Sequence, residues 1–165
     1  TIYAIAAIEL LMLTGARRDE VLSLRWDHID LERGRARLPD SKTGAKTIQL
    51  PPSAVEVLDT LPREDGNPWV IVGHKKGCAL VNIQKPWDAI RRVAGLEDVR
   101  LHDLRHTFAT YLAESGTSLL QIGKVLGHSS AYTTAKYAHL RDDPTRKAAT
   151  VGAEMLQGHL NGQAG

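Results

Sequence analysis

Residues 101–140 read LHDLRHTFATYLAESGTSLLQIGKVLGHSSAYTTAKYAHL and hold four of the seven histidines of the chain. Apolar residues recur in this stretch every three or four positions, which is the period of an amphipathic helix. Gly116 and Gly127 interrupt the pattern, and glycine commonly ends a helix. The stretch therefore predicts three consecutive helices, over about 102–114, 118–126 and 131–139.

The rest of the chain adds further helices and one extended region. Between Ile29 and Pro51 the pattern changes to the short pieces HIDLE, RARLP and TIQLP, which are separated by Gly34 and by DSKTGAK. Such pieces, joined by glycine-containing turns, are typical of antiparallel strands. We therefore expect an α+β fold that is mainly helical, a single domain with a small antiparallel sheet of three strands packed on a helical bundle. The other helices are expected over about 2–13, 17–24, 53–61, 83–94 and 143–160.

The composition fits one globular domain. The chain has 165 residues and a formal net charge of +2, from 21 basic and 19 acidic residues. So small a net charge does not indicate a nucleic-acid partner, and any basic surface has to be local. The single cysteine, Cys78, excludes an internal disulfide and fits a reducing compartment such as the bacterial cytoplasm. The apolar opening run TIYAIAAIELLMLTGA is too short to span a membrane and contains Glu9, so we expect a buried helix and no membrane partner.

Two patterns that could indicate a metal or a nucleotide are incomplete. His102 and His106 have the i, i+4 spacing of a zinc site, but Asp103 stands where a zinc protease has its glutamate, and no third ligand is evident nearby. DSKTGAKT lacks the glycines of a phosphate-binding loop. We therefore expect no metal and no cofactor, and we expect His106 and His139 to serve packing or surface roles.

Two pairs of residues are ambiguous when each is taken alone. His102 and Arg105 share one face of a helix, yet a helix cap and a surface ion pair would explain them equally well. Arg17 follows the break at Thr14-Gly15, and Glu20 follows one turn later, so these two residues could form an ordinary ion pair.

Five motifs in a fixed order give these pairs their meaning. They are TGxRxxE, SKTG, HxLR, LGH and YAHL, with His128 placed 23 residues after Arg105 and Tyr137 nine residues after His128. In this order and spacing the chain resembles the tyrosine recombinases, the phage-integrase family, over essentially its whole length.

The resemblance implies a catalytic role at six positions. They are two arginines, a lysine on a strand turn, two histidines and the tyrosine nucleophile: Arg17, Lys42, His102, Arg105, His128 and Tyr137. Glu20 matches the acidic residue behind the first arginine and is expected to support it. Among the other tyrosines, Tyr3 and Tyr111 fall in helix interiors, where we expect them to pack, and Tyr132 lies too close to His128.

The chemistry implied by the resemblance is phosphoryl transfer to a tyrosine. Tyr137 attacks a DNA phosphodiester and forms a 3′-phosphotyrosyl link with a free 5′ hydroxyl, so that religation needs neither metal nor ATP. Only about a thousandth of an ordinary tyrosine is phenolate at neutral pH, so the site has to offset roughly 4 kcal/mol. Arginines suit this task because their planar forks match phosphate oxygens. His102 and His128 are interchangeable as phosphate ligand and proton acceptor, and Lys42 is expected to protonate the leaving oxygen.

The resemblance also sets expectations for partners and organisation. Double-stranded DNA and other protomers of the recombinase are the expected partners, with four protomers on two DNA sites, in the cytoplasm of a bacterium and associated with its nucleoid. The alternatives are a type IB topoisomerase that relaxes supercoils, and an inactive DNA-binding module. Further candidate DNA contacts are explained more simply as solvated surface charges: Lys75, Lys76, Arg91, Arg92 and Lys124.

The chain contains no match to the N-terminal core-binding domain that family members usually carry. We therefore expect residues 1–165 to form the catalytic domain alone. Residues 143–165 are expected to include a tail helix that packs either in cis or on a neighbouring protomer.

Overall fold

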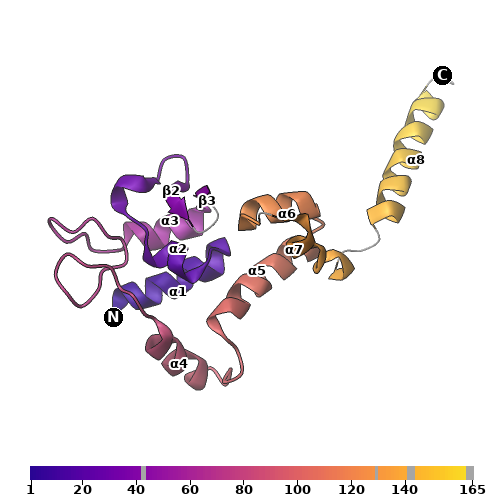
Figure 1. Ribbon diagram of the computed structural model, residues 1–165. Coiled ribbons are helices and arrows are strands. Elements are labelled where there is room, and N and C mark those ends of the chain that lie inside the picture. Colours follow the sequence, from indigo (N-terminus) through magenta and orange to yellow (C-terminus); the bar gives the residue numbers. More distant parts are fainter. Residues whose placement is uncertain (42–43, 129, 141–143, 163–165) are drawn as a thin grey trace.

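The structure is a computed structural model that describes residues 1–41, 44–128, 130–140 and 144–162. It is mainly helical and contains one small sheet, which confirms the expected fold class (Figure 1). In chain order the elements are α1 (Ile2–Thr14), α2 (Arg18–Leu22), the 3-10 helix η1 (Trp26–His28), β1 (Ile29–Asp30), β2 (Arg35–Ser41), β3 (Gly44–Gln49), α3 (Pro52–Asp59), α4 (Gln84–Val93), α5 (Leu101–Glu114), α6 (Leu119–Leu126), α7 (Ala131–Ala135), the 3-10 helix η2 (Ala138–Leu140) and α8 (Pro144–Gly162).

The sheet has three antiparallel strands in the order β1-β2-β3, as the sequence predicts. Ala36 of β2 pairs with Ile48 of β3, and both side chains are buried in the hydrophobic core. Lys46 lies two residues before Ile48, and alternate residues of a strand share one face. The strand therefore directs a lysine toward the interior of the protein. Lys42, at the turn between β2 and β3, lies outside the described residues.

Helix α1 forms the centre of the larger of two hydrophobic clusters. Its buried side chains pack against residues from α2, α3 and the sheet, and α5 also contacts it. This confirms the expectation that the apolar opening run is a buried helix. In the part of the chain that the structure describes, we find no helix with the length and hydropathy of a membrane span.

The smaller cluster joins α5, α6 and the tyrosine that follows α7. Its buried members are Ala109, Ala113, Ile122, Leu126 and Tyr137. The two clusters meet at Gly15, which ends α1 with a φ of 62° and donates its N–H to the Leu11 carbonyl. Phe108 and Leu126 lie so close to Gly15 that a β-carbon there would collide with the Phe108 ring. Glycine at this position therefore lets the two halves approach each other.

Three local features differ from the expectations. The predicted helix 131–139 is split into α7 and η2, and Tyr137 lies between them. Arg17 is the N-cap of α2 and not its first helical residue. Tyr111, expected to pack, is 68% exposed.

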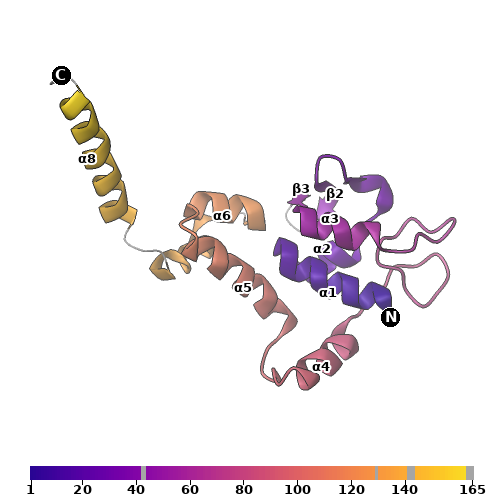
Figure 2. The ribbon, with the colours of Figure 1, turned by 180° about the vertical axis from the view of Figure 1, so that it is seen from behind.

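The tail forms a helix, as expected. This helix, α8, leads away from the other helices in both views (Figures 1 and 2).

We expect Gly15→Ala to lower the free energy of unfolding by about 2–4 kcal/mol, because it adds left-handed strain and a steric overlap. Gly95→Ala is the matched control, since Gly95 has a φ of 67° but open space around the added methyl. The control is expected to lose only the strain, about 1 kcal/mol. Urea denaturation measures both values, and equal losses in the two variants would contradict the collision.

Candidate active site

The guanidinium of Arg105 is buried where the two hydrophobic clusters meet. It comes from the first half of α5, and its Nη1 donates to the Gly15 carbonyl at 2.6 Å while its Nη2 donates to the Leu126 carbonyl at 2.8 Å. A guanidinium has five N–H donors, so donors remain after these two bonds. Burial lowers the pKa of Arg105, and the nearby charge of Arg17 lowers it further. The site therefore holds a buried positive charge that a bound anion would stabilise.

Arg17 lies next to this group, at the break between α1 and α2. Its Nη1 donates to Glu20 Oε1 at 2.9 Å, and its Nη2 donates to the Gly127 carbonyl at 3.5 Å. The backbone N–H of Arg17 donates to Glu20 Oε2, which caps the start of α2. The Arg17–Glu20 pair that the sequence left open therefore exists. The Arg17 side chain remains 34% exposed, so the pair leaves part of it accessible.

Lys46 is a third cation at this point, and the sequence analysis did not identify it. Its buried ammonium donates to Glu20 Oε2 at 2.7 Å and to the Leu126 carbonyl at 3.1 Å. Burial lowers the pKa of Lys46, and the ion pair with Glu20 opposes that effect. Burial raises the pKa of Glu20, but hydrogen bonds from Lys46 and from the Arg17 amide outweigh it, so this pKa lies below its usual value. Lys46 therefore joins β3, α2 and the end of α6.

His128 follows directly after the turn that ends α6. Its Nδ1 lies 2.8 Å from the hydroxyl of Thr134. Burial, and then the charges of Arg105 and Arg17, lower the pKa of His128 to about 4. The imidazole is therefore neutral at neutral pH, and the two arginines are close enough to act on it.

His102 is the exposed second residue of α5 and is not the cap of that helix. The N-cap is Arg100, whose N–H donates to Asp103 at 2.8 Å. Burial and the charge of Arg105 lower the pKa of His102. His102 and Arg105 line the same cavity, so the structure brings the predicted HxxR pair together.

This cavity, of about 510 Å³, is rich in arginine. Asp19 is the one acidic residue among its described lining residues. Arg91 and Arg100 pair with neighbouring carboxylates, while Arg17 shares Glu20 with Lys46. The charge of Glu20 also acts on Arg105. The basic lining residues are five arginines and one histidine, and we refer to the whole as the arginine-lined cavity: Arg17, Arg18, Arg91, Arg100, Arg105 and His102. Its chemistry favours a phosphate or another oxyanion.

Tyr137 is 5% exposed and belongs to the smaller hydrophobic cluster. Its hydroxyl lies 2.7 Å from His106 Nδ1. Burial raises the pKa of Tyr137, and the charge of Arg105 opposes the rise. His106, which was expected to serve a packing or surface role, is thus hydrogen-bonded to the predicted nucleophile. His139, by contrast, is exposed.

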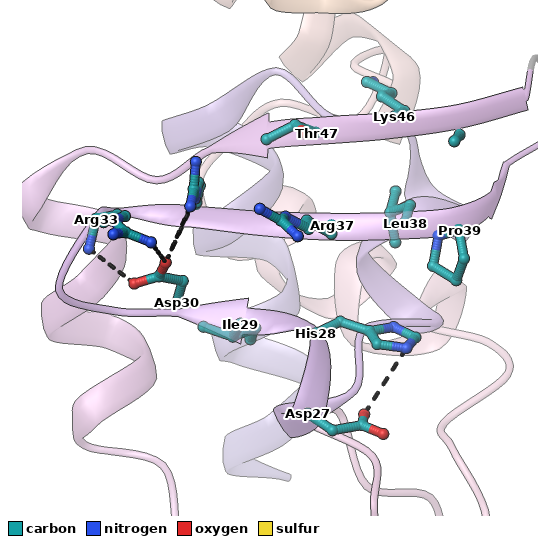
Figure 3. A pocket seen from close by; sticks show the side chains of 12 residues that line it. Asp27, His28, Ile29, Asp30, Arg33, Arg37, Leu38, Pro39, Lys46 and Thr47 are labelled. Carbon is teal, nitrogen blue, oxygen red and sulfur yellow. Dashed lines mark hydrogen bonds and ion pairs between the residues drawn. The ribbon is translucent and has the colours of Figure 1, made fainter.

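A second cavity, of about 660 Å³, lies over the sheet (Figure 3). Asp30 pairs with Arg33 at 3.6 Å, as Figure 3 shows, and also with Arg35 at 3.3 Å. Asp27 likewise faces His28 at 3.9 Å. The two carboxylates, Asp27 and Asp30, therefore offset only part of the positive charge that lines this second cavity. Of the site residues described above, only Lys46 lines it. Among the described residues, no group of three or more histidine, cysteine or carboxylate side chains is arranged to hold a metal ion.

Comparison with known proteins identifies the family. The profile of the phage integrase family matches residues 1–143. The chain is 31% identical to the shufflon-specific DNA recombinase of Escherichia coli over 134 residues, which cover 80% of this chain and 33% of that protein. It is also 31% identical to the tyrosine recombinase XerC of Staphylococcus epidermidis, covering 85% of this chain and 50% of XerC.

The solved structure of the XerH site-specific recombinase bound to its difH substrate has a similar fold. The TM-score is 0.73 at 26% identity, over 91% of this chain and 46% of that one. The mainly helical fold is thus that of an integrase catalytic domain. The chain belongs to the phage integrase family, and it spans about a third to a half of the length of the curated relatives that it matches.

We expect Lys46→Met to lower the free energy of unfolding by about 2–4 kcal/mol, because it leaves the buried carboxylate of Glu20 without its ammonium partner. Lys124→Met is the matched control, since Lys124 is an exposed lysine on α6. The control is expected to change stability by less than about 0.5 kcal/mol. Urea denaturation of both variants tests this, and similar values would show that the Lys46 pair does not hold the elements together.

The lowered pKa of Glu20 predicts a pH-dependent contribution to stability. The folded pKa lies below the unfolded value of about 4.3, so the carboxylate stabilises the fold above that pH, and this stability is lost as the pH falls through the folded pKa. The cost of Glu20→Gln is therefore expected to shrink between about pH 6 and pH 3. Unfolding curves at several pH values measure the difference, and a cost that does not change with pH would count against the expectation.

Proposed function

We propose that the chain is the catalytic part of a site-specific DNA recombinase in which Tyr137 is the nucleophile. The observation that carries the proposal is the buried Arg105 in the arginine-lined cavity, whose charge acts on His102, His128 and Tyr137. These four side chains come from α5, from the end of α6 and from the turn after α7. Arg105 and His102 line the cavity, whereas His128 lies on a neighbouring pocket and Tyr137 is buried beside α5. We propose that these last two side chains reach a phosphodiester that the arginines hold.

Arg17 and Arg105 are proposed to hold the two non-bridging oxygens of the scissile phosphate. Arg105 is fixed by the Gly15 and Leu126 carbonyls, and Arg17 by Glu20, so both forks are oriented before DNA binds. Preorganised donors of this kind lower a barrier because they need no rearrangement when charge develops. Glu20 and Lys46 are proposed to orient the arginines without touching the phosphate.

The histidines and Lys42 complete the proposed site. His102 lines the cavity and is placed to contact the phosphate. Neutral His128 can donate from Nε2 to a phosphate oxygen if its Nδ1 accepts from Thr134. Lys42 is proposed, on the family resemblance, to protonate the leaving 5′ oxygen. The products are a 3′-phosphotyrosyl link to Tyr137 and a free 5′ hydroxyl, and religation reverses the step without metal or ATP.

The proposal extends to the partners and the place of action. The XerH structure holds a DNA substrate, which supports double-stranded DNA as the ligand of this chain. We propose that protomers of the recombinase assemble on DNA, with residues 1–165 as the catalytic domain and the tail helix in cis or on a neighbour. The relatives come from bacteria and a Salmonella phage, which supports a role on the bacterial nucleoid in the cytoplasm.

Covalent capture of DNA tests the nucleophile. The substrate is a pool of nicked duplex oligonucleotides with randomised sequence on both sides of the nick, so that the cleaved end is lost and religation is prevented. With EDTA present, the chain is expected to form an SDS-resistant adduct, and Tyr137→Phe is expected to form none. Tyr132→Phe, which changes an exposed tyrosine five residues away, is the matched control. An adduct that persists in Tyr137→Phe, or one that requires a metal, would rule out the proposal.

A further inference from the structure

We propose that His106 is a catalytic residue that takes the proton of the Tyr137 hydroxyl when this tyrosine attacks the phosphate. The inference rests on the proposed function and assigns the proton acceptor, a role that the sequence left between His102 and His128. The hydrogen bond that the structure shows for the Tyr137 hydroxyl goes to His106 Nδ1, at 2.7 Å. Heavy atoms at this distance are within reach for direct proton transfer.

The contacts of His106 fix the direction of this hydrogen bond. The ammonium of Lys136 lies 3.2 Å from the same Nδ1 atom. An ammonium has no lone pair and can only donate, so Nδ1 must carry the lone pair, and the proton of the neutral ring lies on Nε2. The Tyr137 hydroxyl is therefore the donor and His106 the acceptor, which is the arrangement that a general base requires.

The surroundings of His106 favour its neutral imidazole, which is the form that can accept a proton. Burial lowers its pKa, and the charges of Lys136, His102 and Arg100 act in the same direction, while Asp103 opposes them. A neutral imidazole is available to accept a proton at neutral pH. The charge of Lys136 also disfavours the imidazolium that forms, which favours return of the proton during religation.

His102 and His106 lie side by side but contact different parts of the proposed site. Their rings meet edge to face, with centroids 4.8 Å apart and planes at 89°. His102 lines the arginine-lined cavity, whereas His106 contacts the tyrosine hydroxyl. The ring pair thus places one imidazole on the phosphate side and the other on the nucleophile side.

Attack on phosphorus is accompanied by proton transfer from Tyr137 to His106. The proton of Tyr137 Oη passes to His106 Nδ1, Oη forms a bond to phosphorus, and the bond from phosphorus to the 5′ oxygen breaks. The leaving oxygen takes a proton from Lys42, as proposed above. In religation the 5′ hydroxyl attacks phosphorus, its proton returns to Lys42, and Tyr137 leaves with the proton held by His106.

His106→Asn separates a base from a purely structural partner. The asparagine oxygen can occupy the place of Nδ1 and accept the hydrogen bond, but it does not take up a proton near neutral pH. With the same pool of nicked duplexes, we expect the single-turnover rate of adduct formation to fall at least about 100-fold. The rate of the parent protein is expected to rise with pH, and this rise should vanish in His106→Asn. His139→Asn, at an exposed histidine, is the matched control and is expected to keep the parent rate and profile.

Two further variants test the role of His106 as proton acceptor if His106→Asn is poorly folded. Added imidazole is expected to restore cleavage to His106→Ala. Lys136→Met should move the rising limb of the pH profile to higher pH, because the imidazole loses a nearby positive charge. A parent rate and profile in His106→Asn, while Tyr137→Phe forms no adduct, would overturn the role of His106 and leave the proposed function intact. An adduct in Tyr137→Phe would instead overturn the proposed function.

Discussion

The arrangement of the site depends on two carbonyl groups at the C-terminal end of α6. The Leu126 carbonyl accepts from both Arg105 and Lys46, and the next carbonyl, of Gly127, accepts from Arg17. The last carbonyls of a helix lack partners within the helix and carry partial negative charge, so they suit cations. Three segments far apart in the sequence are thereby held at one point.

The cations that meet at the end of α6 outnumber the carboxylates beside them. Arg17 and Lys46 pair with the one carboxylate, Glu20, while Arg105 is held by backbone carbonyls. The charge of Arg17 lowers the pKa of Arg105, so the like charges act on one another. A phosphodiester would relieve this repulsion. The same groups that stabilise the fold therefore prepare it to bind an oxyanion, so changes to Lys46 or Glu20 are expected to affect stability and binding together.

The sequence predicts much of this arrangement, but some features depend on tertiary packing. Helix periodicity and glycine stops predict nearly every helix, and the strand pieces predict the sheet. The ordered motifs identify the family and point to the residues that gather around Arg105. Lys46 was missed because a lysine on a strand is usually exposed, although its spacing from Ile48 places it on the core face. The hydrogen bond between His106 and Tyr137 was not predicted because its two partners lie 31 residues apart in the sequence.

The two hydrophobic clusters differ in size, and we expect the smaller one to open at a lower cost in free energy. Among the described residues, the cluster around Tyr137 has fewer buried apolar members than the one around α1, and buried apolar area sets the free energy of local opening. Segments that open at low cost exchange their amide hydrogens sooner. The tyrosine thus belongs to the less strongly protected part of the molecule, while the first arginine and its carboxylate are anchored in the more rigid part.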